Sequence, residues 1–103
     1  MYKEIIKETI PVLKQIIANH NIQFKPDELV MKLKENEEQI KNKIQECMYE
    51  VQKDYEAANF GLKTKKPTAL QKTVLNVSYT HALCEIAWYK LSLIGINKKD
   101  YIK

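Results

Sequence analysis

Two side chains that can do chemistry, His81 and Cys84, stand three residues apart in the sequence. Residues at this spacing share a face of a helix, so the two can pair. A reactive cysteine also needs an exposed, electropositive site, and the residues around this pair are apolar. A zinc site needs more ligands than these, and none stands at a suitable spacing. We therefore expect His81 to be a core histidine hydrogen-bonded across a helical bundle, and we expect no catalysis, metal or other cofactor.

An acidic stripe is the second feature with chemical weight. Glu46, Glu50 and Asp54 stand four residues apart, so a helix places their carboxylates in one row. Like charges at this spacing repel one another, and positive groups should offset them. Lys90, or the lysines within residues 63–66, can do so inside the protein. Otherwise the stripe contacts a basic partner.

The densest basic patch consists of Lys63, Lys65, Lys66 and Lys72. Such a patch can contact phosphates and bind nucleic acid with an affinity that depends on salt but not on base sequence. All basic residues of the chain are lysines, so no arginine reads bases, and no aromatic residues alternate with the patch to stack on them. A solvated loop and a nucleic-acid contact therefore remain as two interpretations of the patch.

Composition limits the fold to helices. Only two glycines and three prolines interrupt the 103 residues, which predicts long regular elements and few loops. Hydrophobic residues make up 45% and charged residues 29%, the balance of an ordinary globular protein, and we predict one all-α domain over residues 1–103. The net charge of +4 is uneven, because residues 1–60 carry nine lysines and eleven acidic residues while residues 61–103 carry eight lysines and two acidic residues. The two halves either attract each other within the bundle or provide a basic face for an anionic partner.

The cysteines and the N-terminal segment predict a cytoplasmic protein. Cys47 and Cys84 have no further cysteine at metal spacing, and we expect free thiols in a reducing compartment. Lys7 and Glu8 interrupt the apolar residues near the N-terminus, so no signal-peptide core is present. The most apolar stretch, residues 69–96, contains four polar or charged residues that make it unsuitable for crossing a membrane: Lys72, His81, Glu85 and Lys90.

Helical periodicity predicts three helices, over residues 2–18, 26–60 and 68–94. Pro11 either kinks the first helix or makes it restart, and the segment Asn19, His20 and Asn21 should end it, because asparagine tolerates the left-handed conformation that closes a helix. Residues 34–39 contain no apolar side chain, and we favour a continuous second helix that is poorly covered there over one that splits. Gly95 should end the third helix. The predicted architecture is a three-helix antiparallel bundle, or a four-helix one if a helix splits.

The third helix carries a seam of apolar spacing that extends over three heptads. Its members are Leu70, Val74, Val77, His81, Cys84, Trp88 and Leu91. A second stripe widens the apolar face and consists of Leu75, Ala82, Ile86, Tyr89 and Leu93. A helix that is apolar on two sides belongs inside a bundle or in an oligomer interface, which predicts a homodimer. Tyr79 and Tyr89 lie off the main seam and are predicted anchors for a partner.

These observations predict a small non-enzymatic helical protein that binds another macromolecule, most simply a protein, as an inhibitor, adaptor or subunit. Its size and lysine-only composition fit an accessory protein of a phage or mobile element. The main alternative is a nucleic-acid-binding protein that uses the lysines of residues 63–72 and 98–103. An enzyme that uses His81 is the third interpretation, and it requires a histidine within reach of solvent.

Overall fold

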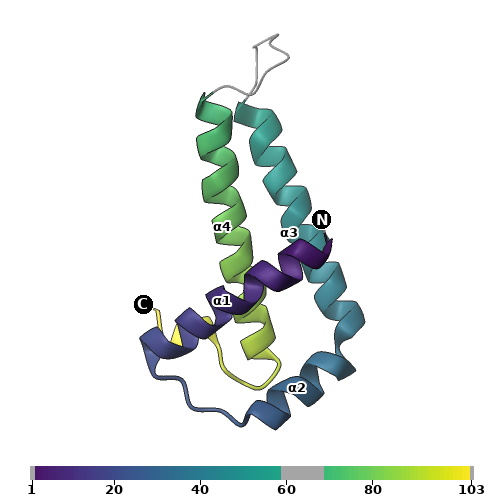
Figure 1. Cartoon of the computed structure of the whole chain (residues 1–103), viewed down its shortest axis with the longest axis vertical. Coiled ribbons are helices and arrows are strands. Elements are labelled where there is room, and N and C mark those ends of the chain that lie inside the picture. The colour runs from purple at the N-terminus through teal and green to yellow at the C-terminus, as the bar shows by residue number, and fades with distance from the viewer. Residues whose placement is uncertain (1, 59–68, 103) are drawn as a thin grey trace.

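The computed structural model describes residues 2–58 and 69–102, and these residues form an all-α structure, as predicted (Figure 1). No strand occurs in either described range. The elements are α1 (Tyr2–His20), α2 (Pro26–Glu35), α3 (Glu37–Ala58), α4 (Ala69–Ser92) and a short 3₁₀ turn, Lys98–Asp100. No helix in these ranges is long and apolar enough to cross a membrane.

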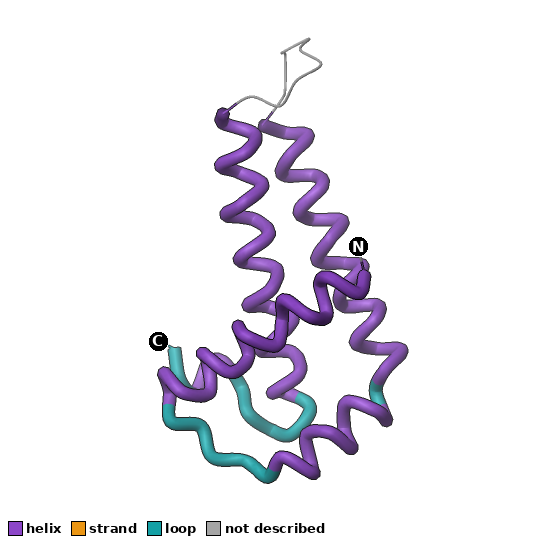
Figure 2. The backbone as a smooth tube through the Cα atoms, viewed as in Figure 1, coloured by secondary structure: helices purple, strands orange, loops and turns teal. Residues whose placement is uncertain are grey.

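An antiparallel hairpin of α3 and α4 forms the frame of the molecule. These two helices make the most extensive contact in the structure, and α1 crosses α4 obliquely on one side of the hairpin (Figures 1 and 2). The shorter α2 runs across the lower end, where it contacts both α3 and α4. None of the described helices covers the opposite side of the hairpin.

The first helix runs without interruption through Pro11 and ends at His20, two residues beyond the predicted end at residue 18. Asn21 adopts a left-handed conformation with φ of 50°. The Ile22 N–H then donates to the carbonyl of Ile17 at 3.1 Å, and the Asn21 N–H donates to Ala18 at 3.4 Å, which is the Schellman pattern of a helix end. Ile22 is thereby turned into the core, where it is 5% exposed.

The predicted continuous helix over residues 26–60 is wrong, because Asn36 separates α2 from α3. Its backbone leaves the helical region at φ −117° and ψ 26°, and both its N–H and its side-chain Nδ2 donate to the carbonyl of Lys32. The Asn36 carbonyl then accepts from Ile40 N–H at 2.9 Å and starts α3. An amide side chain that bonds locally to the backbone competes with helix propagation, and the polar stretch 34–39 offers no packing to oppose it. The split that the sequence offered as the alternative is therefore what occurs.

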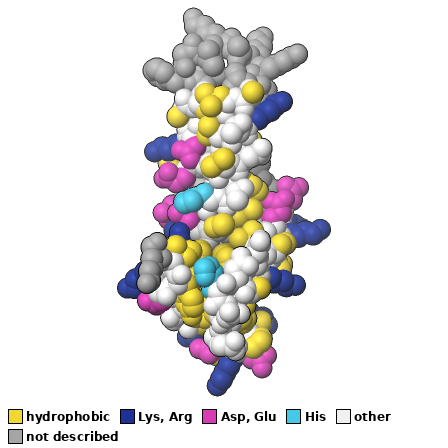
Figure 3. Space-filling model, turned by 90° about the vertical axis from the view of Figure 1, so that its left-hand side faces the viewer, with side chains coloured by type: hydrophobic (Ala, Val, Ile, Leu, Met, Phe, Trp, Pro, Cys, Tyr) yellow, Lys and Arg dark blue, Asp and Glu magenta, His cyan; other side chains and the backbone are white. Residues whose placement is uncertain are grey.

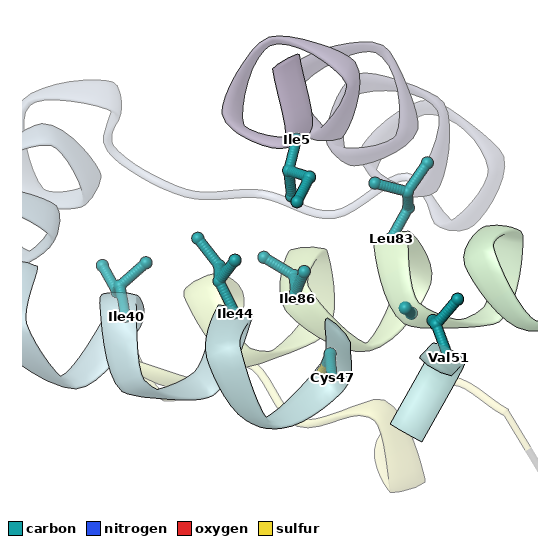
Figure 4. Packing of buried hydrophobic residues seen from close by; sticks show 8 residues of the cluster. Ile5, Ile40, Ile44, Cys47, Val51, Leu83 and Ile86 are labelled. Carbon is teal, nitrogen blue, oxygen red and sulfur yellow. The ribbon is translucent and has the colours of Figure 1, made fainter. Parts of the chain in front are cut away.

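The larger core cluster lies where α1 meets the hairpin. Ile5 of α1 points between Ile44 of α3 and Ile86 of α4 (Figure 4), and all three side chains are at most 2% exposed. The other members are Ile40, Cys47, Val51, Ala82 and Leu83. Thr9 is also fully buried, and its hydroxyl is satisfied there because it donates to the Ile5 carbonyl at 2.6 Å within α1.

A second cluster closes the lower end of the molecule around Trp88. It consists of Ile16, Ile22, Ala87, Trp88 and Leu91, and the rings of His20 and Tyr101 lie 5.7 Å and 6.2 Å from the Trp88 ring. Gly95 ends α4 with φ of 84°, and Ile96 N–H donates to the Leu91 carbonyl at 3.1 Å, so this end also has the Schellman pattern. The predicted role of Gly95 is confirmed.

The predicted seam of α4 is correct only at its lower end. Trp88 and Leu91 are buried, but Leu70 and Val77 are 59% and 65% exposed, and the His81 side chain is 67% exposed. The core position expected for Val77 and His81 is therefore wrong, and Cys84 is only partly buried. Most of the second stripe packs, since Ala82 and Ile86 belong to the larger core cluster and Tyr89 and Leu93 pack against it, whereas Leu75 is 39% exposed.

Candidate functional site: a groove between α3 and α4

The uncovered side of the hairpin contains a groove of about 390 Å³. We call it the hairpin groove. Cys47, Val51 and Ala82 form its buried floor. Its walls are polar side chains of both helices: Lys43, Glu46, Glu50 and Asp54 of α3, and Ser78, His81 and Glu85 of α4.

The groove is acidic. Four carboxylates line it, those of Glu46, Glu50, Asp54 and Glu85, against one lysine, Lys43, which gives a net charge of −3 with histidine neutral. Within the described residues, no ion pair reaches Glu46 or Glu50. The predicted acidic stripe is therefore present as a row, and it borders a hollow rather than a neighbouring basic helix.

Lys90 does not offset this row, contrary to one of the two expectations. Its side chain is buried at 7% exposure outside the groove, and burial alone lowers the pKa of its ammonium group. A nearby carboxylate would raise that pKa instead. The other expected source of positive charge, Lys63, Lys65 and Lys66, lies outside the described residues.

One carboxylate of the groove connects a thiol to a histidine. Glu85 accepts a hydrogen bond from Cys47 Sγ at 3.7 Å through Oε2, and its Oε1 lies 3.7 Å from Nδ1 of His81. Burial, with a smaller contribution from Glu85, raises the pKa of the Cys47 thiol to about 11, although Lys43 opposes the shift. The thiol is therefore protonated at neutral pH, which is the opposite of what a nucleophilic cysteine needs.

A serine, a histidine and an aspartate also meet beside the groove, but not in the order of a hydrolytic triad. The Ser78 hydroxyl donates to Asp54 at 2.7 Å, whereas in a triad it donates to the histidine. His81 pairs instead with Glu85. No group of three or more histidine, cysteine or acidic side chains in the described chain is placed to hold a metal ion.

An exposed apolar stripe of α4 continues from the groove. A second hollow of about 360 Å³ shares Asp54, Ser78 and His81 with the groove and is otherwise lined by Thr73, Val74 and Val77. Leu70 extends the stripe by one more turn and is also more than half exposed. Figure 3, which views the molecule from the α4 side, shows hydrophobic and acidic side chains next to one another along the hairpin.

The two predicted tyrosine anchors are tied into the protein. Tyr79 donates a hydrogen bond to the Glu8 carboxylate of α1, and burial together with this bond raises the pKa of its phenol to about 12. Tyr89 packs against the larger core cluster, with Lys43 Nζ 6.0 Å from its ring centre. Lys72 is exposed on the first turn of α4.

Tyr49 was not among the predicted partner anchors, but it is 59% exposed on α3 and has Lys53 Nζ 4.8 Å from its ring centre. Its position two residues from both Cys47 and Val51, a rotation of about 200°, places it on the side of α3 opposite these buried residues, and this spacing could have identified it as exposed. The position of His81 and Val77 relative to the acidic row depends on the register of α3 against α4. Residue spacing within one helix does not determine this register.

Comparison of the chain with protein-family models, curated protein sequences and solved structures gives no significant match. The groove is therefore interpreted from its own residues.

Proposed function

We propose that this chain is a non-enzymatic helical interaction protein, and that it binds a protein partner on the uncovered side of the α3–α4 hairpin. One observation carries the proposal: an exposed apolar stripe starts at Asp54, one end of a row of carboxylates that make no ion pair within the described residues. The partner should therefore present apolar side chains flanked by positive ones.

The energetics favour such a partner. Covering exposed apolar surface contributes about 25 cal/mol per Å², and Leu70 and Val77 each leave more than half of their surface available. Carboxylates on the rim mainly accelerate and orient the encounter with a cationic surface. Together these effects give both affinity and selection among partners.

The state of the groove side chains supports a binding function over catalysis. His81 is within reach of solvent, as an enzyme would need. However, its neighbour Cys47 has a protonated thiol and Ser78 is bonded to Asp54, so neither is an activated nucleophile. Two free thiols, Cys47 and Cys84, support a reducing, cytoplasmic location.

No observation in the described residues favours nucleic acid over a protein as the partner. The hairpin groove repels phosphates, and of the four patch lysines only Lys72 lies in the described ranges. Nucleic-acid binding through Lys72 and the other patch lysines remains a distinct outcome of the test.

The test is affinity capture from host lysate with and without nuclease, using matched variants. Val77→Asn changes the stripe, and Val30→Asn makes the same change at a residue of α2 that is 52% exposed and remote from the groove. We expect a nuclease-resistant protein that Val30→Asn retains and Val77→Asn loses. Equal capture by both variants would contradict the proposed surface. Capture of nucleic acid alone, lost with nuclease and weakened by Lys72→Ala, would establish the alternative.

A further inference from the structure

The outer side of α1 carries a cationic apolar strip. Five exposed residues share one side of the helix, because most of them are three, four or seven residues apart. They are Lys3, Ile6, Lys7, Ile10 and Lys14. Ile6 and Ile10 keep 36% and 45% of their surface exposed. We call these five residues the α1 strip.

The α1 strip is left over after α1 has packed within its own chain. The opposite side of α1 supplies the buried residues Ile5, Thr9 and Ile16. No ion pair in the described residues engages Lys3, Lys7 or Lys14. The strip therefore combines the two properties that the hairpin groove requires of an occupant.

Charge and spacing of the two surfaces match. The strip carries three lysines, and the groove has a net charge of −3. At 1.5 Å per residue, Lys7 and Lys14 are separated by about 10 Å along α1, and Glu46 and Asp54 by about 12 Å along α3. Ile6 and Ile10 lie beside the lysines of the strip, and Val74 and Val77 lie beside Asp54 at one end of the carboxylate row.

The strip cannot reach the groove of its own chain. α1 packs on the side of α4 that carries Tyr79 and Leu83, whereas Ser78, His81 and Glu85 of the same helix line the groove. The strip also points away from the hairpin, since Ile5 on the inner side of α1 contacts the core (Figure 4). Only a second molecule can bring the two surfaces together.

We propose that the hairpin groove binds the α1 strip of a second copy of this chain. The contact joins two different surfaces, so each copy supplies one strip and one groove. This inference rests on the proposed function, because it assigns an occupant to the same face. Another protein would have to displace the strip in order to bind.

The test is a charge exchange read by sedimentation of the full chain. The strip variant Lys7→Glu/Lys14→Glu and the groove variant Glu46→Lys/Glu50→Lys each bring like charges together. We expect self-association of the wild type, and a dissociation constant at least about tenfold higher in each variant, equivalent to 1.4 kcal/mol. An equimolar mixture should associate again, because each strip then meets a groove of opposite charge.

Matched controls keep this result specific. Lys25→Glu/Lys34→Glu makes the same change of charge at exposed lysines outside the strip and should self-associate like the wild type. Added salt should weaken the wild-type contact, since the charged groups are exposed. The neutral pairs Lys7→Gln/Lys14→Gln and Glu46→Gln/Glu50→Gln give smaller losses in the same direction if a charge-reversed variant fails to fold.

Two outcomes would overturn the inference: a wild type that stays monomeric at every accessible concentration, or a mixture of the two variants that does not associate. These outcomes are separable from failure of the proposed function. A monomeric chain that still captures a protein through Val77 removes only the second-copy contact. A self-associating chain that captures no protein or nucleic acid removes only the proposed function.

Discussion

Cys47 should be almost unreactive in the folded protein, although it borders the hairpin groove. The pKa of its thiol rises from 9.0 to about 11, and this increase lowers the fraction of thiolate at neutral pH about a hundredfold. The side chain is also only 3% exposed, so a reagent needs the helices to separate before it can reach the sulfur. Both effects act in the same direction, and the expected slowing is at least about a hundredfold.

Alkylation with iodoacetamide measures this directly. The Cys84→Ser variant leaves Cys47 as the single thiol, and its rate in native buffer is compared with the rate in urea at the same pH. Cys47→Ser provides the matched chain in which only Cys84 reacts. Native and unfolded rates within about tenfold of each other would refute both the burial and the raised pKa, and would reopen a nucleophilic role for the thiol.

The same shift predicts a loss of stability at high pH. The unfolded chain releases the Cys47 proton near pH 9 while the folded chain holds it to about pH 11, so the stabilisation is complete below pH 9 and is lost as pH rises through 11. Two units correspond to about 3 kcal/mol. Urea unfolding of the wild type and of Cys47→Ala across this range isolates the contribution, because the variant lacks this slope.

Three further substitutions test the packing. Lys90→Met should stabilise the protein by about 1–3 kcal/mol in urea unfolding near neutral pH, because it removes a buried ammonium group and keeps the apolar stem of the side chain. Since burial lowers the pKa of Lys90, the free-energy cost of the buried charge should disappear as pH rises towards 10.5. A destabilised variant would show that Lys90 has a partner. Gly95→Ala should cost about 1–2 kcal/mol through backbone conformation alone, because an added Cβ meets no atom within 4 Å; an unchanged midpoint of thermal unfolding would contradict the left-handed φ. Ile86→Ala should lower the free energy of unfolding by about 2–5 kcal/mol, whereas Leu70→Ala at the exposed stripe should change it by less than about 0.5 kcal/mol. Similar losses of stability in both variants would mean that the predicted seam is packed.

Helix ends were the part of the fold that local sequence determined best. Residues 19–21 and Gly95 were expected to end their helices, and Asn21 and Gly95 do adopt left-handed conformations, because this preference depends on one residue and its backbone. The break at Asn36 corresponds to the less favoured of the two alternatives for residues 34–39. Leu29, Leu33, Ile40 and Ile44 keep the spacing of one continuous helix, so periodicity carries no signal of the change of direction between α2 and α3.

The register of α4 could not be predicted for a different reason. Its apolar residues cover most of the circumference, so two stripes fit helical spacing about equally well. Packing against α1 and α3 decides between them, because these helices bury the stripe that contains Ala82 and Ile86 and leave Val77 exposed. The acidic row was predicted from one helix, but the groove beside it depends on how two helices align.

The crossing of α1 over α4 also has a consequence for the order of folding. The bond between Glu8 and Tyr79 spans 71 residues of chain, whereas the Gln71 side chain reaches the Tyr55 carbonyl across only 16. Closing the longer loop costs about 1.3 kcal/mol more entropy, so we expect the α3–α4 hairpin to form first and α1 to dock onto it afterwards. The same order should govern transient opening, with the amides of α1 exchanging hydrogen for deuterium before those of the hairpin.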